Sequence, residues 1–254
     1  MRNIALRLSY DGSAYHGWQL QKTEPTVALA LENALSKMCG GKTKVTGCGR
    51  TDAGVHALRY CANFRTENAI PADRIPCAVN SHLPSDVVVT AATDAPRDFC
   101  AIRSCLKKEY VYKILNSRMR DPFLRTRACF YPAPINMDLL VRSAKAFEGT
   151  HDFAAVRSAG TETKSTVRTV FRCEAEKNGD IITVSICADG FLYNMARAIV
   201  GTMICASRGK LDPDRLRELL SKGDRRLAGP TMPPQGLYLS RLWYDGDVGE
   251  MMRN

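Results

Sequence analysis

The sequence predicts an α+β fold of two similar lobes, each a mainly antiparallel sheet with helices on one face. Alternating apolar and polar segments are separated by hairpin-type turns such as "KNGD" at 177–180, which favours antiparallel pairing. Amphipathic helical stretches lie between these segments. The strand "IALRLSYDGSAY" near the start is echoed by "ITVSICADGFLY" in the second half. A matching unit in each half predicts two lobes that face each other across a central basic cleft.

The first lobe is expected to cover residues 1–104. Its strands are predicted at 4–10, 44–49, 60–65 and 87–92. Thr26 is predicted to cap a helix that Gly40 and Gly41 end. The apolar side chains of this helix share one face; they are Val27, Leu31, Leu35 and Met38.

The second lobe is expected to cover residues 105–247, with residues 248–254 as a tail. Its strands are predicted at 109–115, 167–176 and 181–187, with a last strand in "GLYLSRLWY". Helices are predicted at 137–147, 191–207 and 212–222, the last opened by an Asp-Pro pair.

The composition favours a polyanionic partner. The formal net charge is +10, a value typical of nucleic-acid-binding proteins, although an ordinary solvated basic surface also explains it. No apolar run is long enough to span a bilayer, and the N-terminus lacks the apolar core of a secretion signal. The ten cysteines contain no Cys-x-x-Cys pair. Together these features predict a cytoplasmic protein with reduced thiols, without a metal or cofactor and without a membrane partner.

The most unusual stretch is "GCGRTDAGVHA" at 47–57, in which Arg50 and Asp52 stand among three glycines. In an extended chain their side chains project from the same side, and a carboxylate beside a guanidinium keeps its charge even when partly buried. Glycines permit conformations and close approaches that other residues forbid. The stretch is therefore either a β-turn with an exposed ion pair, worth about 0–1 kcal/mol, or a functional carboxylate.

Other candidate sites are weaker. "SKMCGGKT" ends like a phosphate-binding loop, but Ser36 replaces the first glycine, and the order of helix and strand is inverted. The four histidines share no metal spacing. A metal-dependent nuclease would need clustered carboxylates, for which Asp11, Asp52 and Asp189 are the available trio. Asp11 and Asp189 each precede a glycine at a strand end, where turn formation explains them.

Seven blocks in order resemble the tRNA pseudouridine synthases of the TruA family. They are "YDGSAYHGWQLQ" with "TVALALENAL", "GRTDAGVHA", "NSHLP", "KKEYVYKI", "TVRTV", "GFLYNMARAIVGTM" and "GLYL". Together they extend over nearly the whole chain. The resemblance implies the pseudouridine synthase fold and an isomerase that needs no cofactor. It also implies a homodimer that modifies uridines 38, 39 and 40 in the anticodon stem-loop of tRNA.

The resemblance also assigns site residues. It implies that Asp52 is the catalytic carboxylate, that Arg50 is its electrostatic partner and displaces the base, and that Tyr110 stacks on the uracil. Arg197 would approach Asp52 from the second lobe. The helical spacing agrees, because Tyr193, Arg197 and Gly201 fall on one stripe of the predicted helix.

Three positions depart from the family pattern: Cys100, Ile102 and Tyr60. These departures put some RNA or inter-lobe contacts in doubt. The alternative from another class is a non-catalytic RNA-binding or RNA-folding protein on the same scaffold, which would not need Asp52.

Overall fold

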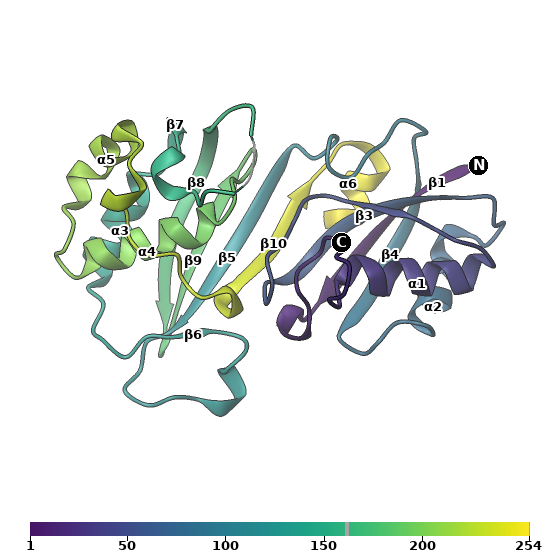
Figure 1. The fold of residues 1–254 in the computed structure, drawn as a ribbon, viewed down its shortest axis with the longest axis horizontal. Helices are drawn as coiled ribbons and strands as arrows, with labels where there is room; N and C mark the ends of the chain where they lie inside the picture. Colours follow the sequence, from purple (N-terminus) through teal and green to yellow (C-terminus); the bar gives the residue numbers. More distant parts are fainter. Residues whose placement is uncertain (161–162, 254) are drawn as a thin grey trace. The chain divides into compact units, whose positions relative to one another are not determined.

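The computed structural model describes residues 1–160 and 163–253 and divides into two compact units. The first unit contains Met1–Lys108 and Tyr238–Asn254, and the second contains Glu109–Leu237 (Figure 1). Residues 238–247 thus belong to the first unit, whereas the sequence-based division assigns them to the second lobe.

The sheet of the first unit has the strand order β4-β1-β3-β10, with β2 also paired to β3. These strands are β1 (Arg2–Tyr10), β2 (Val45–Gly47), β3 (His56–Thr66), β4 (Val87–Ala95) and β10 (Leu237–Trp243). β1 pairs antiparallel with both β3 and β4, whereas β10 runs parallel to β3 with Tyr238 opposite His56. This backbone pairing joins the last strand to the first unit.

The helix α1 (Val27–Cys39) forms as predicted. The Thr26 side chain accepts a hydrogen bond from the Leu29 N–H, and Gly40 ends the helix in the left-handed conformation. Val27, Leu31 and Leu35 are buried, but Met38 is only half-buried. The short helix α2 (Ile75–Asn80) is an addition to the predicted elements.

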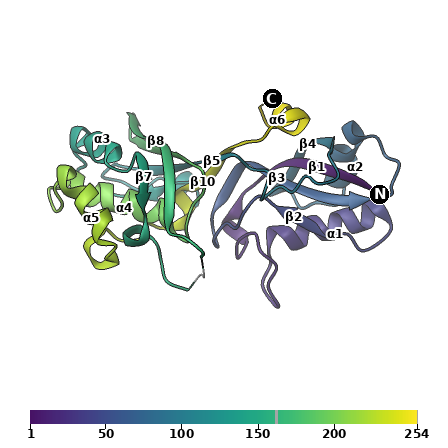
Figure 2. The same ribbon diagram turned by 90° about the horizontal axis from the view of Figure 1, so that it is seen from above.

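Residues predicted to form a tail belong instead to the helix α6 (Gly246–Arg253); Asn254 lies outside the described residues. The Arg7 guanidinium donates to the Met251 carbonyl, and that of Arg59 donates to the carbonyls of Met252 and Arg253. These bonds satisfy carbonyls that a helix C-terminus leaves unpaired. Figure 2 shows α1 and α6 on opposite sides of the strands of this unit.

The sheet of the second unit has the order β5-β9-β8-β7, with β6 beside β5. The strands are β5 (Lys107–Leu115), β6 (Cys129–Phe130), β7 (Gly149–Asp152), β8 (Val167–Asn178) and β9 (Ile181–Ala188). The β8–β9 hairpin turns through Gly179, at the predicted place, with φ of 56°. The expected α+β architecture with mainly antiparallel sheets is confirmed.

The helices of the second unit are α3 (Met137–Lys145), α4 (Met195–Ser207) and α5 (Leu216–Lys222). α3 packs against β8 and α4. The remaining short elements are 3-10 turns at Gly12–Ala14, Ala72–Arg74, Pro122–Leu124, Ala154–Val156, Pro213–Arg215, Arg225–Leu227 and Pro234–Gly236.

The internal echo in the sequence has a structural counterpart. β1 lies between β3 and β4 and leads into Asp11-Gly12, while β9 lies between β5 and β8 and leads into Asp189-Gly190. Both strands are therefore flanked on both sides within their own sheet.

No helix in residues 1–160 or 163–253 is long and apolar enough to cross a membrane. All ten cysteines are free thiols.

Candidate active site

The glycine-rich stretch is a loop between β2 and β3. The pairing of these strands ends at Gly47 opposite Ala62, and residues 48–55 belong to no strand. Sheet alternation therefore does not set the directions of Arg50 and Asp52. The Val55 N–H donates to the Asp52 carbonyl over 3.1 Å, and Gly54 has φ of 77°. A positive φ at the third position is the requirement of a type II turn, which is why glycine stands there.

The segment 15–18 fixes the backbone of this loop. The Trp18 N–H donates to the Thr51 carbonyl, and the Gly54 N–H donates to the Tyr15 carbonyl, each over 3.2 Å. Gly17 has φ of 87°, and a Cβ added there would lie 2.3 Å from the Thr51 oxygen. The two segments therefore meet backbone to backbone, directly beside Asp52.

Aromatic side chains support the loop on another side. The rings of Trp18 and Tyr60 stack with centroids 4.1 Å apart, and the Tyr60 hydroxyl donates to the Gly49 carbonyl. The Tyr10 hydroxyl lies 2.9 Å from Thr51 Oγ1, and this pair is buried. Tyr60, which departs from the family pattern, therefore has a structural role beneath the candidate carboxylate.

Two further contacts complete the support. Gly47 leaves room for the aromatic side chains, because an added Cβ would lie 2.2 Å from the Tyr60 hydroxyl oxygen. The Lys108 ammonium donates to the Cys48 carbonyl over 2.6 Å. Cys48 is fully buried, and burial raises the pKa of its thiol to about 11. The thiol is therefore protonated and packs like a small apolar side chain beneath the loop.

The loop buries some of its side chains and leaves its two charged residues accessible. Cys48, Thr51 and Val55 are buried, whereas Arg50 is exposed and Asp52 is half-buried. A carboxylate held on a fixed backbone and open to one side has the arrangement that a nucleophile or general base requires.

The other two aspartates of the possible metal-binding trio have local partners. Asp11 Oδ1 accepts from the Ser13 N–H at 3.0 Å and lies 3.2 Å from Nδ1 of His56. Asp189 Oδ1 accepts from the Thr169 N–H at 3.1 Å. In the part of the chain that the structure describes, no three His, Cys, Asp or Glu side chains gather as metal ligands. Both aspartates therefore have the turn and strand-end roles that their positions predict.

In the second unit, Tyr110 lies on β5 and is half-buried. Its ring meets Phe191 edge to face, with centroids 4.8 Å apart and an interplanar angle of 80°. Edge-to-face packing fixes the ring's orientation.

Arg197 lies in the first turn of α4 and is held by two acceptors. Its Nε donates to the Met232 carbonyl at 2.6 Å, and its Nη1 donates to Asn194 Oδ1 at 2.7 Å. Asn194 has φ of 60°, so α4 begins at Met195 rather than at Phe191 as predicted. The prediction that Tyr193 shares a helical stripe with Arg197 is therefore wrong, because Tyr193 precedes the helix.

A close crossing brings Met232 to Arg197. A Cβ on Gly201 would lie 1.8 Å from the Pro230 carbonyl oxygen, so only glycine fits at this point of α4. The Gly229 N–H donates to Thr202 Oγ1 at 2.9 Å. Residues 229–232 are not among the residues that the sequence singled out; Gly201 within a mainly apolar helix was the available signal.

The remaining departures from the family pattern lie in the first unit. Cys100 is buried, and its N–H donates to Ser104 Oγ at 3.2 Å, while Ile102 is half exposed. The adjacent Ala101 N–H donates to Asn63 Oδ1 at 2.9 Å. This segment is therefore tied to β3 within its own unit.

Comparison with known proteins identifies a family. The family model described as tRNA pseudouridine synthase matches residues 8–103 and 143–245. Proteins named tRNA pseudouridine synthase A are 44% identical in Thermoanaerobacter pseudethanolicus and 42% identical in Caldicellulosiruptor bescii, each over 244 residues. Both alignments cover 96% of this chain and all of the relative. The chain therefore belongs to the tRNA pseudouridine synthase family, the isomerases that convert uridine to pseudouridine in tRNA.

Proposed function

We propose that the chain isomerises uridines 38, 39 and 40 in the anticodon stem-loop of tRNA, with Asp52 as the catalytic carboxylate. The observation that carries the proposal is the rigid mounting of Asp52. The backbone beside it is hydrogen-bonded to Tyr15 and Trp18, and its side chain is half-buried on a buttressed loop. Fixed geometry of this kind is what a single catalytic group needs.

The reaction breaks the bond from uracil N1 to C1′, turns the base and joins C5 to C1′. The proton on C5 passes to solvent and N1 gains a proton, so atoms and charge balance without a redox step. Asp52 attacks C1′ or C6 as a nucleophile, or removes a ribose proton to give a glycal. Each route requires the carboxylate to reach the nucleoside from one side.

The target base must leave its stack, which costs a few kcal/mol. Arg50 is exposed on the same loop as Asp52, and we propose that its side chain displaces the uracil from the stack. Tyr110 is the proposed stacking partner of the uracil, a contact worth about 1–3 kcal/mol. Its ring is already oriented by Phe191.

Arg197 is proposed to serve the same uridine as Asp52. Two acceptors, the Met232 carbonyl and Asn194 Oδ1, fix its guanidinium in place. Pre-positioned cations stabilise developing negative charge without reorganising during the reaction.

The net charge of +10 supports binding through tRNA phosphates. We expect affinity for tRNA to fall steeply as salt is added. An affinity that stays constant between low and moderate salt contradicts this electrostatic contribution.

Tritium release from tRNA that carries 5-tritiated uridine tests the catalytic assignment. The experiment compares the wild type with Asp52→Asn, both in chelator, and uses Asp73→Asn as a control because Asp73 is an exposed aspartate of the same unit. Release by the wild type and the control, but not by Asp52→Asn, supports the proposal. Equal release by all three shows that another carboxylate is catalytic, and release by none with tRNA still bound favours a binding protein. Transcripts with cytidine at positions 38, 39 and 40 test which uridines react.

We further propose a homodimer that acts in the cytoplasm, as the family resemblance implies. Sedimentation equilibrium at micromolar concentration tests the assembly, and a monomer mass contradicts it. Recovery of the protein in the membrane fraction of lysed cells contradicts the location.

A further inference from the structure

We infer that residues 117–127 of the second unit, here named the arginine loop, form a second RNA-contact surface. This surface binds the tRNA at a point distant from the reacting uridine. Phe123 stacks on a base, and the arginines contact phosphates. The inference rests on the proposed function because it takes tRNA as the bound molecule.

The charge of the arginine loop is concentrated. Its sequence, "SRMRDPFLRTR", contains four arginines and one aspartate, a net charge of +3 from eleven residues of a chain whose net charge is +10. Arg118, Arg120, Arg125 and Arg127 are all exposed. A basic cluster with an interleaved aromatic side chain is typical of surfaces that bind single-stranded or looped RNA.

The aromatic side chain is presented by an ordered turn. Asp121 Oδ1 accepts from the Phe123 N–H at 2.8 Å, and Pro122 opens the 3-10 turn Pro122–Leu124. The Arg127 N–H donates to the Leu124 carbonyl at 2.9 Å. On this turn the Phe123 residue is 86% exposed. A side chain mounted on a fixed turn loses little conformational entropy when a base stacks on it.

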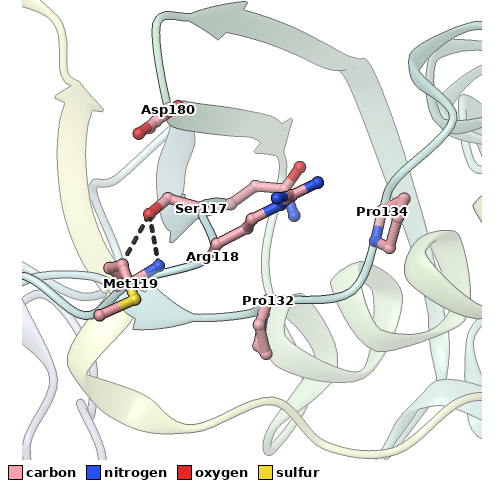
Figure 3. Close-up of a pocket in the computed structure, with 7 residues that line it drawn as sticks. Ser117, Arg118, Met119, Pro132, Pro134 and Asp180 are labelled. Carbon is pink, nitrogen blue, oxygen red and sulfur yellow. Dashed lines mark hydrogen bonds between the residues drawn. The ribbon is translucent and has the colours of Figure 1, made fainter.

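A cavity of about 570 Å³ lies at the base of the arginine loop. It is lined by Asn116, Ser117, Arg118, Met119, Pro132, Pro134 and Asp180. Figure 3 shows Arg118 extending across the cavity toward Pro134, while Ser117 Oγ donates to the Met119 carbonyl at 2.7 Å. Arg118 and Asp180 both line this recess, and the Arg118 guanidinium is the cationic group there that a phosphate would contact.

The arginine loop lies away from the proposed base-stacking residue. Tyr110 and Leu115 are five residues apart on β5, a separation of roughly 17 Å at the rise of a strand. The loop follows the end of this strand (Figure 1). The arginine loop therefore starts roughly 17 Å from the proposed stacking contact, so we infer that it contacts a nucleotide other than the target.

RNA fits this surface better than a second copy of the chain. A two-fold contact through the arginine loop would oppose two surfaces that each carry a net charge of +3, and like charges facing each other disfavour association. A polyanion is complementary to the same surface.

Binding of unmodified tRNA, measured by fluorescence anisotropy over a range of salt concentrations, tests the inference. Arg118→Gln/Arg125→Gln is expected to weaken binding and to reduce the salt slope by about 2, whereas Lys210→Gln/Arg217→Gln, an equal charge loss at exposed positions elsewhere in the unit, leaves the slope unchanged. Phe123→Ala is expected to raise Kd roughly five- to 150-fold, and Phe123→Trp to retain affinity. Phe123→Leu, which keeps apolar area without a ring, weakens binding like Phe123→Ala.

Kinetics separate this inference from the catalytic proposal. The arginine-loop variants are expected to raise KM for tRNA and keep the wild-type kcat, measured as tritium release at saturating tRNA. Wild-type affinity in both Phe123→Ala and the double arginine variant overturns the inference while leaving Asp52 untouched. A sedimentation mass of Phe123→Ala that differs from that of the wild type, both without RNA, shows that Phe123 contacts protein. That result also overturns the inference.

Discussion

Replacing Gly17 by alanine should perturb the loop that carries Asp52, because Gly17 contacts the backbone of that loop at Thr51. Gly17 has φ of 87°, and its new Cβ would lie 2.3 Å from the Thr51 carbonyl oxygen. Real Cβ contacts essentially never fall below 3.0 Å, so the segments that carry Gly17 and Thr51 must separate by at least about 0.7 Å (3.0 − 2.3). Thr51 adjoins Asp52, and the Asp52 carbonyl carbon lies only 3.1 Å from the added Cβ, so we expect the shift to reach the carboxylate.

Two free-energy costs and one rate effect follow. A Cβ in the left-handed region costs about 1–2 kcal/mol, and overpacking adds about 1–3 kcal/mol, so Gly17→Ala loses about 2–5 kcal/mol of stability. A catalytic group displaced by roughly 1 Å loses on the order of 10²-fold in rate. We therefore expect a folded but less stable enzyme whose kcat falls by one to two orders of magnitude.

Gly40→Ala is the matched control. Gly40 also has a positive φ, 71°, but an added Cβ there meets nothing within 4 Å. It should lose only the backbone term of about 1–2 kcal/mol and keep its wild-type rate. Thermal melting and single-turnover tritium release measure both variants. Wild-type kcat in Gly17→Ala, or equal losses of stability in the two variants, refutes the idea that Gly17 sets the position of Asp52.

Two further predictions concern buried groups. At pH 8, a thiol-specific disulfide reagent should modify the exposed Cys77 in the native protein but not Cys48. Burial makes the Cys48 thiol inaccessible and raises its pKa to about 11, so little reactive thiolate is present. Rapid modification of Cys48 contradicts the fixed packing beneath the loop. Burial alone would raise the pKa of Glu148, but the Cys173 N–H and the Lys145 ammonium bind its carboxylate and hold the pKa below its ordinary value. Its contribution to stability is therefore complete above the unfolded pKa of about 4.3 and is lost as pH falls through the lower folded pKa. Urea unfolding should show Glu148→Gln less stable than wild type at pH 7 and equal to it once Glu148 is protonated; a constant difference contradicts this linkage.

Local sequence signals predicted those elements whose stability is local. The Thr26 cap, Gly40 and the intervening apolar face were sufficient for α1, and alternation with a glycine turn was sufficient for the β8–β9 hairpin. The start of α4 was misplaced because the left-handed backbone of Asn194 is not a conformation that asparagine adopts by default. α6 was missed because contacts with Arg7 and Arg59, distant in the sequence, stabilise its end.

For the candidate site, the sequence by itself singled out Arg50, Asp52, Tyr110 and Arg197 as candidates through ordered family blocks, but it did not predict the contacts that hold them. Only the tertiary structure placed Gly17 against Thr51, the Tyr60 hydroxyl on the Gly49 carbonyl, and the Met232 carbonyl on Arg197. Each of these contacts is made to a backbone carbonyl, a group that every residue carries, so no side-chain pattern in the sequence predicts the partner. The side chains of a site determine its chemistry, whereas contacts to the backbone of distant segments determine how firmly those side chains are held.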